Sequence, residues 1–353
     1  MTRACIFIPL QLLYVCLFAQ NVDQEVLVER AMYDSAKAEF LRFEREHGHF
    51  IQTQNTNLHY LEWGNPSHLP LIWLHGSFTN SYELKDIVEE LVKQEYYVIA
   101  IDHYGHGLTQ IPNHEVSLYH VADDVSDLME EKNISKAVIG GWSRGGIIAT
   151  AFYDAYPEKV LGLILEDGGS VSTNTYYHKM EEEELTTRVD EIFKERMDIP
   201  TFDSEFEAYQ YFYSQEEGGT QFPLLAWIQE DSTGKWSIGA GLEDLFHMAS
   251  KKQFLETVLR PTKASMYGES MALIEPKIIY RNLSVPMLIL DPVSDNDLFP
   301  FERENSLLQQ AHPTLVRYMI YKDTGHNIHY EQPDRFTRDL IEFKSVIETF
   351  WTK

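Results

Sequence analysis

The chain has few cysteines and few basic residues. Its 353 residues include two cysteines, Cys5 and Cys16, and 29 Lys and Arg residues against 55 Asp and Glu residues. No disulfide framework is possible beyond residue 16. The formal net charge of −26 disfavours nucleic acid as a partner, because its phosphates would be repelled, and disfavours electrostatic adhesion to an anionic membrane. We expect neither partner for the mature chain.

Motifs for bound cofactors are also lacking. There is no glycine-rich phosphate loop ending in Lys and Ser or Thr, and no dinucleotide fingerprint at the first strand-to-helix turn. His103, His106, His114 and His120 fall in one region, but no acidic or cysteine partner stands at metal-ligand spacing. We therefore expect no cofactor and no metal, and a small-molecule substrate as the partner.

The first twenty residues are predicted to be a secretory signal peptide, residues 1–20. A short positive start precedes a hydrophobic stretch from Cys5 to Phe18, and Ala19 offers a small residue for cleavage. The stretch is too short to span a bilayer comfortably. We expect export to a secreted or periplasmic location, with uncleaved anchoring as the alternative, and cleavage would remove both cysteines.

Hydrophobic periodicity divides the rest of the chain. Val28, Met32, Ala36, Phe40 and Phe43 recur at helical spacing and predict a leader helix packed on the domain. From about residue 50, strand-like and helix-like segments alternate, which predicts a mostly parallel sheet with helices on both faces. Between 170 and 281 this alternation stops, aromatic clusters and charged helical stretches take over, and we expect an inserted helical unit. The predicted divisions are 21–169 and 282–353 for the core, and 170–281 for the insertion.

The chemistry is predicted from the segment Gly141-Trp142-Ser143-Arg144-Gly145, which follows an apolar run and opens into a helix-like stretch. In this setting a Gly-x-Ser-x-Gly segment forms a nucleophile elbow, a strained turn that lifts the serine oxygen clear of the sheet. Ser143 is therefore the candidate nucleophile. A serine hydroxyl also needs a base that takes its proton and a carboxylate that orients the base.

Both partners are expected downstream of the serine. His326 follows a predicted strand at 316–321 and is the candidate base. A second predicted strand at 285–290 runs into a loop that carries Asp291, Asp295 and Asp297. One of these three carboxylates is expected to orient His326. The other two are expected to be turn carboxylates that hydrogen-bond their own loop.

Four motifs together resemble the α/β-hydrolase family, in its capped branch. They are the elbow, the Gly-His pair at 325–326, His-Gly at 75–76 after a strand, and Asp-x-x-Gly-x-Gly at 102–107 after another strand. The Ser, Asp, His chain order is the order of that family. The resemblance implies an α/β-hydrolase fold with a mostly parallel eight-stranded sheet, helices on both faces and an inserted helical cap.

The resemblance also implies roles for individual residues. The family reads Gly-x-x-Asp after the strand that precedes the acid; counting places Asp295 at the acid, although Pro292 replaces the glycine. The main-chain N–H of Arg144 is expected to be one oxyanion donor, and that of Ser77, or of Phe78, the second. The Arg144 guanidinium is expected to pair with a buried carboxylate, or else to contact an anionic substrate.

The expected function is a secreted serine hydrolase that acts through an acyl-enzyme on a small or medium ester or amide. Capped relatives also include proline-releasing aminopeptidases and carbon–carbon bond hydrolases, and the fold does not choose among these. Ser143 excludes the haloalkane dehalogenase and epoxide hydrolase reactions, which need an aspartate at that position. The rival of another class is a non-catalytic hydrolase-fold protein that only binds a ligand.

Overall fold

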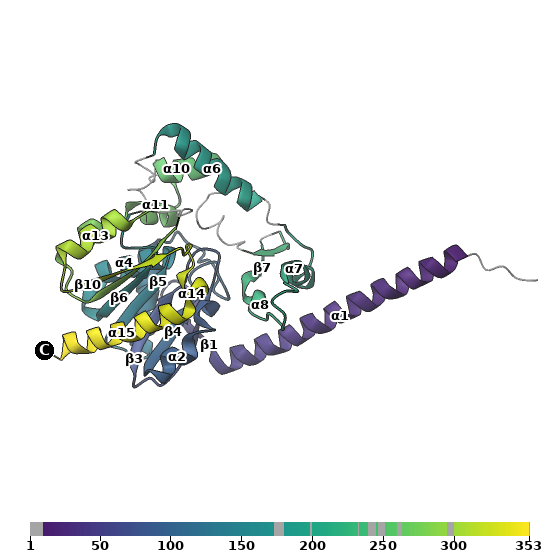
Figure 1. Ribbon diagram of the computed structural model, residues 1–353, viewed down its shortest axis with the longest axis horizontal. Helices are drawn as coiled ribbons and strands as arrows, with labels where there is room; N and C mark the ends of the chain where they lie inside the picture. Colours follow the sequence, from purple (N-terminus) through teal and green to yellow (C-terminus); the bar gives the residue numbers. More distant parts are fainter. Residues whose placement is uncertain are drawn as a thin grey trace, which may run out of the picture.

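The computed structural model describes residues 10–172, 180–197, 200–231, 233–238, 245, 251–259, 263–294 and 300–352. A central sheet with flanking helices forms the body of the molecule, and the first helix projects away from it (Figure 1). Among the described residues, no helix combines the length and the apolar character that crossing a bilayer requires.

The body is built on one eight-stranded sheet, in the order β1-β2-β4-β3-β5-β6-β9-β10. β2 pairs antiparallel with both β1 and β4, and all the other pairs are parallel. This confirms the predicted eight-stranded, mostly parallel sheet. The strands are β1 (Gly48–Gln52), β2 (Asn57–Trp63), β3 (Leu69–Leu74), β4 (Tyr96–Ile101), β5 (Ala137–Trp142), β6 (Val160–Glu166), β9 (Met287–Val293) and β10 (Val316–Lys322).

Helices cover both faces of the sheet because its central strands are apolar on both sides. Every residue of β4 and β5 is buried, the pattern expected for a parallel sheet enclosed by helices. One hydrophobic cluster joins the sheet to α3 (Leu118–Glu131) and α4 (Arg144–Ala155). A second cluster joins the opposite face to α2 (Val88–Lys93) and α15 (Pro333–Trp351). Two further helices belong to this part of the chain: α13 (Glu302–Ala311) connects β9 to β10, and α14 (Ile328–Glu331) follows β10.

The segment between β6 and β9 leaves the sheet and forms the inserted unit (Figure 1). Its elements are α6 (Glu182–Met197), α7 (Glu205–Phe212), α8 (Leu224–Trp227), β7 (Ile228–Glu230), β8 (Trp236–Ile238), α10 (Lys251–Leu259), α11 (Met266–Leu273) and α12 (Pro276–Ile279). The unit is mainly helical, but β7 and β8 pair antiparallel, a small sheet that the sequence did not predict. Gln229 donates a hydrogen bond to the Gly107 carbonyl at 3.0 Å and so links the inserted unit to the loop after β4.

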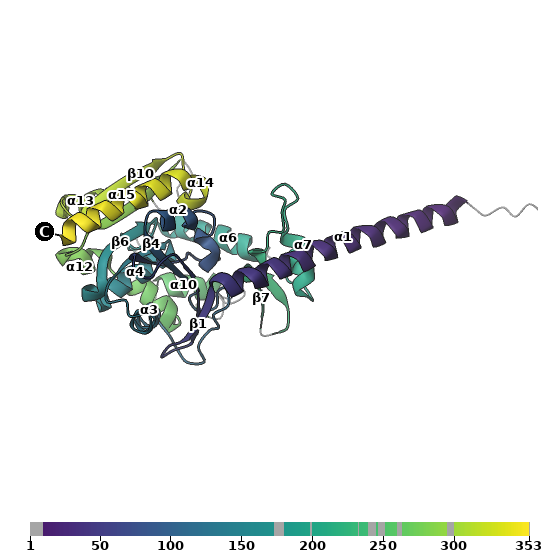
Figure 2. The same ribbon diagram turned by 90° about the horizontal axis from the view of Figure 1, so that it is seen from below.

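The first helix, α1 (Leu10–His47), packs on the body only through its C-terminal part (Figures 1 and 2). Tyr33, Ala36 and Phe40 are buried, whereas Val28 is 60% exposed. The prediction that this apolar stripe packs on the domain is therefore wrong at its N-terminal end, because Val28 lies in the part of α1 that extends beyond the body. Tyr33 donates a hydrogen bond to Glu205 of α7 at 2.8 Å, so α1 also supports the inserted unit.

A buried ionic cluster fastens α1 to the sheet. His59 of β2 has no exposed side-chain surface and lies between two carboxylates, Asp102 at 2.6 Å and Glu44 of α1 at 2.9 Å. Tyr82 donates a second hydrogen bond to Glu44. Burial lowers the pKa of His59, but the two carboxylates outweigh it and raise that pKa to about 9. At neutral pH the cluster therefore contains a charged imidazolium.

We expect the folded chain to lose stability between pH 6.5 and pH 10. The pKa of His59 rises from 6.5 to about 9 on folding, so its contribution is complete below pH 6.5 and is lost as the pH passes through about 9. The contribution is about 3 kcal/mol, since one pKa unit corresponds to about 1.4 kcal/mol. Thermal melting from pH 6 to pH 10 measures the loss. A smaller decline is expected for Glu44→Gln, and equal declines in the two proteins would contradict this role.

Candidate active site

The candidate nucleophile lies at the turn between β5 and α4. Ser143 has φ 53° and ψ −118°, a strained conformation for a residue with a side chain. Only glycine fits at position 145 of this turn, because an added Cβ would lie 1.8 Å from the Leu74 carbonyl oxygen. Residues 141–145 therefore have the local geometry of a nucleophile elbow.

The candidate base reaches this serine from the other end of the chain. His326 follows β10, and its Nε2 lies 2.9 Å from Ser143 Oγ. Its main-chain carbonyl accepts a hydrogen bond from Trp142 Nε1 at 2.7 Å, and the two rings are 5.0 Å apart. The His326 side chain keeps 23% of its surface exposed. The pair is therefore held in place, and part of the imidazole surface is exposed.

The carboxylate that contacts His326 follows β6 and is not one of the three aspartates predicted for this role. Asp167 follows β6, its side chain is 1% exposed, and its Oδ2 lies 2.5 Å from His326 Nδ1. The hydrogen bonds run from Ser143 through His326 to Asp167. Such a chain fixes the imidazole tautomer that leaves Nε2 free to accept the serine proton.

Asp167 is tied to the elbow by the main chain on either side of it. Ser143 donates its N–H to the Glu166 carbonyl at 2.8 Å. A Cβ added at Gly168 would lie 2.1 Å from the Ser143 carbonyl oxygen. Thr150 of α4 donates a hydrogen bond to the Gly169 carbonyl at 2.7 Å. The carboxylate and the serine therefore share one rigid support.

The three carboxylates expected from the sequence have other positions. Asp295, the residue assigned to this role, and Asp297 both lie outside the described residues. Asp291 is buried within β9 and accepts hydrogen bonds from Tyr318 at 2.6 Å and Asn305 at 2.9 Å. Burial raises the pKa of Asp291 to about 7. In the described part of the chain, Asp167 has the contact that was predicted for Asp295.

A sequence signal for Asp167 exists in retrospect. Glu166-Asp167-Gly168-Gly169 directly follows a predicted strand, and β6 is the neighbour of β5 in the sheet. Carboxyl ends of adjacent parallel strands lie at one edge, where α/β sheets carry their sites. An acid followed by two glycines at that position was therefore a candidate on the same grounds as the aspartates after β9.

The predicted oxyanion donors lie on two different elements, one at the start of α4 and one in the loop after β3. Arg144 is the first residue of α4, and Ser77 follows β3. The N–H of Gly76 is already donated to Glu83 Oε2 at 3.2 Å. Ser77 is thus the next main-chain donor along that loop, and Phe78 after it has a positive φ of 62°. Ser77 and Arg144 remain the candidate donors.

Arg144 is 2% exposed, and its side chain points to a group of buried histidines. Its Nη2 donates a hydrogen bond to His106 Nε2 at 2.7 Å, and its guanidinium carbon lies 5.8 Å from the ring centre of Tyr267 in α11. The sequence had favoured a carboxylate partner here, whereas this contact is with an imidazole. Burial, and then the Arg144 charge, lowers the pKa of His106 well below its usual value, so the imidazole is neutral.

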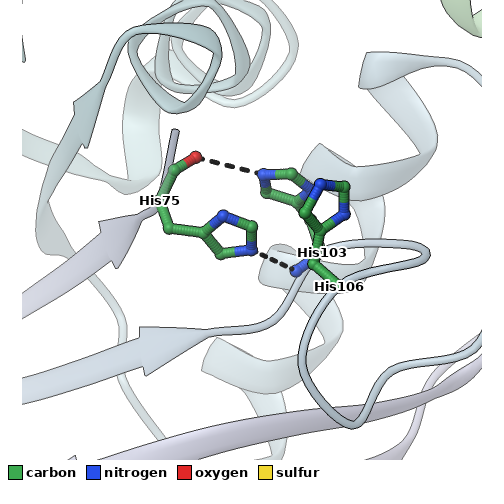
Figure 3. Close-up of side chains that lie close together, drawn as sticks. All are labelled: His75, His103 and His106. Carbon is green, nitrogen blue, oxygen red and sulfur yellow. Dashed lines mark hydrogen bonds between the residues drawn. The ribbon is translucent and has the colours of Figure 1, made fainter. Parts of the chain in front are cut away.

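His75, His103 and His106 form a buried cluster whose candidate ligand nitrogens all lie within 4.8 Å of one another (Figure 3). The rings of His75 and His103 are stacked at 3.7 Å with planes 16° apart, and lone pairs of parallel rings do not converge on one ion. His75 Nε2 accepts the His103 N–H at 3.2 Å, and His103 Nε2 donates to the His75 carbonyl at 3.1 Å. A metal ion would also have to displace the Arg144 cation. The cluster fits a neutral support for the loops after β3 and β4.

Comparison with known proteins agrees with this architecture. Residues 70–333 match the protein family described as alpha/beta hydrolase fold. The chain is 27% identical to epoxide hydrolase 1 of Caenorhabditis elegans over 121 residues, and 30% identical to epoxide hydrolase 4 of Mus musculus over 129 residues. These matches cover 33% and 36% of this chain, and only 29% and 36% of the two epoxide hydrolases.

A longer match is with a putative 2-succinyl-6-hydroxy-2,4-cyclohexadiene-1-carboxylate synthase of Bacillus subtilis, 24% identical over 78% of this chain and 90% of that protein. Among solved structures, a thermophilic esterase from Thermogutta terrifontis is similar with a TM-score of 0.58 and 22% identity, over 85% of this chain and 98% of that chain. This second likeness concerns the fold alone. The family match over 70–333, together with the sheet described above, shows that the chain belongs to the alpha/beta hydrolase fold family.

Proposed function

We propose that the protein is a secreted serine hydrolase that forms an acyl-enzyme on a small or medium ester or amide. One observation carries the proposal: the continuous hydrogen bonds from Ser143 Oγ to His326 and from His326 to Asp167, at 2.9 and 2.5 Å. A base and an orienting carboxylate at these distances activate a serine hydroxyl.

In the proposed reaction Ser143 Oγ attacks the substrate carbonyl carbon while His326 Nε2 takes the hydroxyl proton. The negative charge that develops on the carbonyl oxygen is stabilised by the N–H groups of Arg144 and Ser77. His326 then gives its proton to the leaving alcohol or amine, and the acyl group remains on Ser143. Water, deprotonated by His326, cleaves this ester and restores the free serine.

The side chain at position 143 distinguishes this reaction from epoxide opening, which the names of two relatives raise. A carboxylate that opens an epoxide forms an ester, which water then hydrolyses. A serine oxygen that opens an epoxide would form an ether, which a histidine and water do not cleave. Ser143 therefore supports attack on a carbonyl, where the covalent intermediate is an ester.

Export through residues 1–20 belongs to the same proposal and rests on the sequence alone. The structure describes only the backbone of residues 10–20, as part of α1, and residues 1–9 lie outside the described residues. N-terminal sequencing of the protein recovered from culture medium tests export; a chain that keeps residue 1 and stays with the cells would contradict it.

A serine-reactive fluorophosphonate probe tests the chemistry directly. The full-length protein is incubated with the probe, digested and analysed by mass spectrometry, and the adduct is expected on the peptide that contains Ser143. A panel of p-nitrophenyl esters, lactones and aminoacyl amides, including prolyl amides, then identifies the acyl and leaving groups. Ligand-induced stabilisation of a folded protein that is neither labelled nor active would favour the non-catalytic, ligand-binding alternative.

A further inference from the structure

Another buried histidine lies next to the candidate active site, in contact with the residue that precedes Asp167. His329 of α14 is 1% exposed in its side chain and lies between two carboxylates that have no exposed surface, Glu166 and Glu83. Its Nδ1 lies 2.8 Å from Glu166 Oε1, which also accepts the His329 N–H at 3.0 Å. Its Nε2 is 4.0 Å from Glu83 Oε1. Burying three ionisable side chains costs desolvation free energy, which their pairing with one another offsets.

Each member of this cluster is joined to a different part of the candidate site. Glu166 directly precedes Asp167, and its carbonyl accepts the Ser143 N–H at 2.8 Å. The Trp142 ring, next to the nucleophile, lies 5.1 Å from the His329 ring and 5.0 Å from the His326 ring. The most informative link is that of Glu83. Its Oε2 accepts the Gly76 N–H at 3.2 Å, in the loop that supplies the Ser77 donor.

The position of Gly76 leaves the loop little freedom. A Cβ added at Gly76 would lie 2.3 Å from the Trp142 ring, so the loop is pressed against the residue that precedes the nucleophile. The Glu83 contact also orients the backbone, because it fixes which way the His75–Gly76 peptide faces, and this peptide directly precedes the one that carries the Ser77 N–H. Trp73 of β3 donates a hydrogen bond to the other oxygen, Glu83 Oε1, at 2.7 Å, and this second contact fixes the orientation of the carboxylate.

We propose that Glu83, supported by His329, Glu166 and Trp73, is a positioning residue that holds the oxyanion loop at Gly76–Ser77. The assignment of the loop to an oxyanion hole rests on the proposed function; the hydrogen bond between Glu83 and Gly76 does not. Glu83 touches no reacting atom, and acts by orienting the peptide whose neighbour donates to the oxyanion. The effect is therefore expected in kcat rather than in KM.

The charge of Glu83 makes its role visible in a pH titration. Burial raises the pKa of Glu83 to about 7, partly opposed by His329. The groups that face it are His329 and the phenol of Tyr330 from α14 and Glu166 from β6. Above about pH 7 the ionised carboxylate accepts hydrogen bonds from the Gly76 N–H and the Trp73 indole N–H. Below that pH, the proton bound to the carboxyl group competes with these two donors. The loop is thus expected to be held most firmly on the alkaline side.

The first test uses NMR and does not require activity. In the full-length protein labelled with ¹⁵N-glycine, the Gly76 amide is expected to titrate with a midpoint near pH 7. In Glu83→Gln that titration should disappear, because the amide cannot ionise. In Trp73→Phe, which leaves Glu83 one donor fewer, the midpoint should move to higher pH. A Gly76 amide that does not titrate in the wild type, or that titrates unchanged in both variants, overturns the proposal.

The second test uses hydrolysis of p-nitrophenyl acetate between pH 5 and pH 9. Glu83→Gln is expected to lower kcat by about 10- to 100-fold at pH 8 with little change in KM, less than the loss of a whole oxyanion donor. On the acid side of the pH profile, the fall in kcat should reflect the binding of two protons in the wild type and of one proton in the variant. Glu62→Gln is the matched control, because Glu62 is a part-buried carboxylate on β2 that accepts a hydrogen bond from Tyr97.

The outcomes separate the two proposals. A wild type that is neither labelled by fluorophosphonate nor active refutes the serine hydrolase, while the Gly76 titration still decides the role of Glu83. A labelled and active wild type whose Glu83→Gln variant keeps kcat and the two-proton limb refutes the positioning role alone. Equal losses of kcat in Glu83→Gln and Glu62→Gln would assign Glu83 to general stability and also overturn the proposal.

Discussion

Asp167→Asn is expected to lower kcat for ester hydrolysis by about 10⁴-fold. The amide has almost the same size as the carboxylate, so the side chain still fills its buried position beside His326. It can, however, donate an N–H to Nδ1 and so stabilise the tautomer in which Nε2 carries the proton. His326 then cannot take the proton of Ser143. Initial rates with p-nitrophenyl acetate measure the loss, with circular dichroism as the check on folding.

The same substitution at the other aspartates separates Asp167 from the carboxylates expected from the sequence. Asp295→Asn and Asp297→Asn are expected to cost less than about 10-fold. Asp291→Asn should affect stability more than turnover, because Asp291 contacts Asn305 and Tyr318 within the described residues. A loss at Asp295 greater than the loss at Asp167 would return the orienting role to the loop after β9.

Ser143→Ala is expected to lower kcat by about 10⁶-fold and to abolish fluorophosphonate labelling. The change removes the only atom that joins the acyl group and leaves the backbone of the elbow in place. Turnover that survives would come from the oxyanion donors and substrate binding alone. The measurement is single-turnover hydrolysis at high enzyme concentration, together with labelling of the same preparation.

Non-additivity provides a sharper control for this set. His326→Ala is expected to cost nearly as much as Ser143→Ala, and the double variant should be no worse than either single one, because the two side chains act as a unit. Losses that multiply would mean that Ser143 and His326 contribute separately. In that case the hydrogen bond of 2.9 Å between them is not the one used in turnover.

Local patterns were sufficient for the sheet and for part of the candidate site. The elbow at 141–145 is recognisable because one turn of chain carries all of its constraints, namely close-packed glycines and a serine between a strand and a helix. His326 was found because a Gly-His pair follows a strong strand pattern. The strands themselves follow from continuous apolar runs such as Tyr96–Ile101.

The amino-acid sequence offers less guidance on contacts between distant segments. Asp167 and His326 are 159 residues apart, and which strand end supplies the acid depends on the order of β6, β9 and β10 in the sheet. Periodicity alone does not give that order. The stripe on α1 was misplaced for a similar reason: its spacing is helical throughout, but where the body ends is set by tertiary packing. The hairpin of β7 and β8 has strands of three residues each, too short for a pattern of alternation.

The position of Asp167 has a consequence for how this scaffold can change. Asp167 is the first residue after β6, where the inserted segment leaves the sheet, and its carboxylate contacts His326. Exchanging the insertion for that of another protein should therefore preserve catalysis only when the graft starts beyond Gly169. Grafts that start earlier would remove the support that Thr150 and Ser143 give to the acid. The insertion and the proposed orienting acid thus meet at a single peptide junction, and a library that varies the insertion has its natural boundary there.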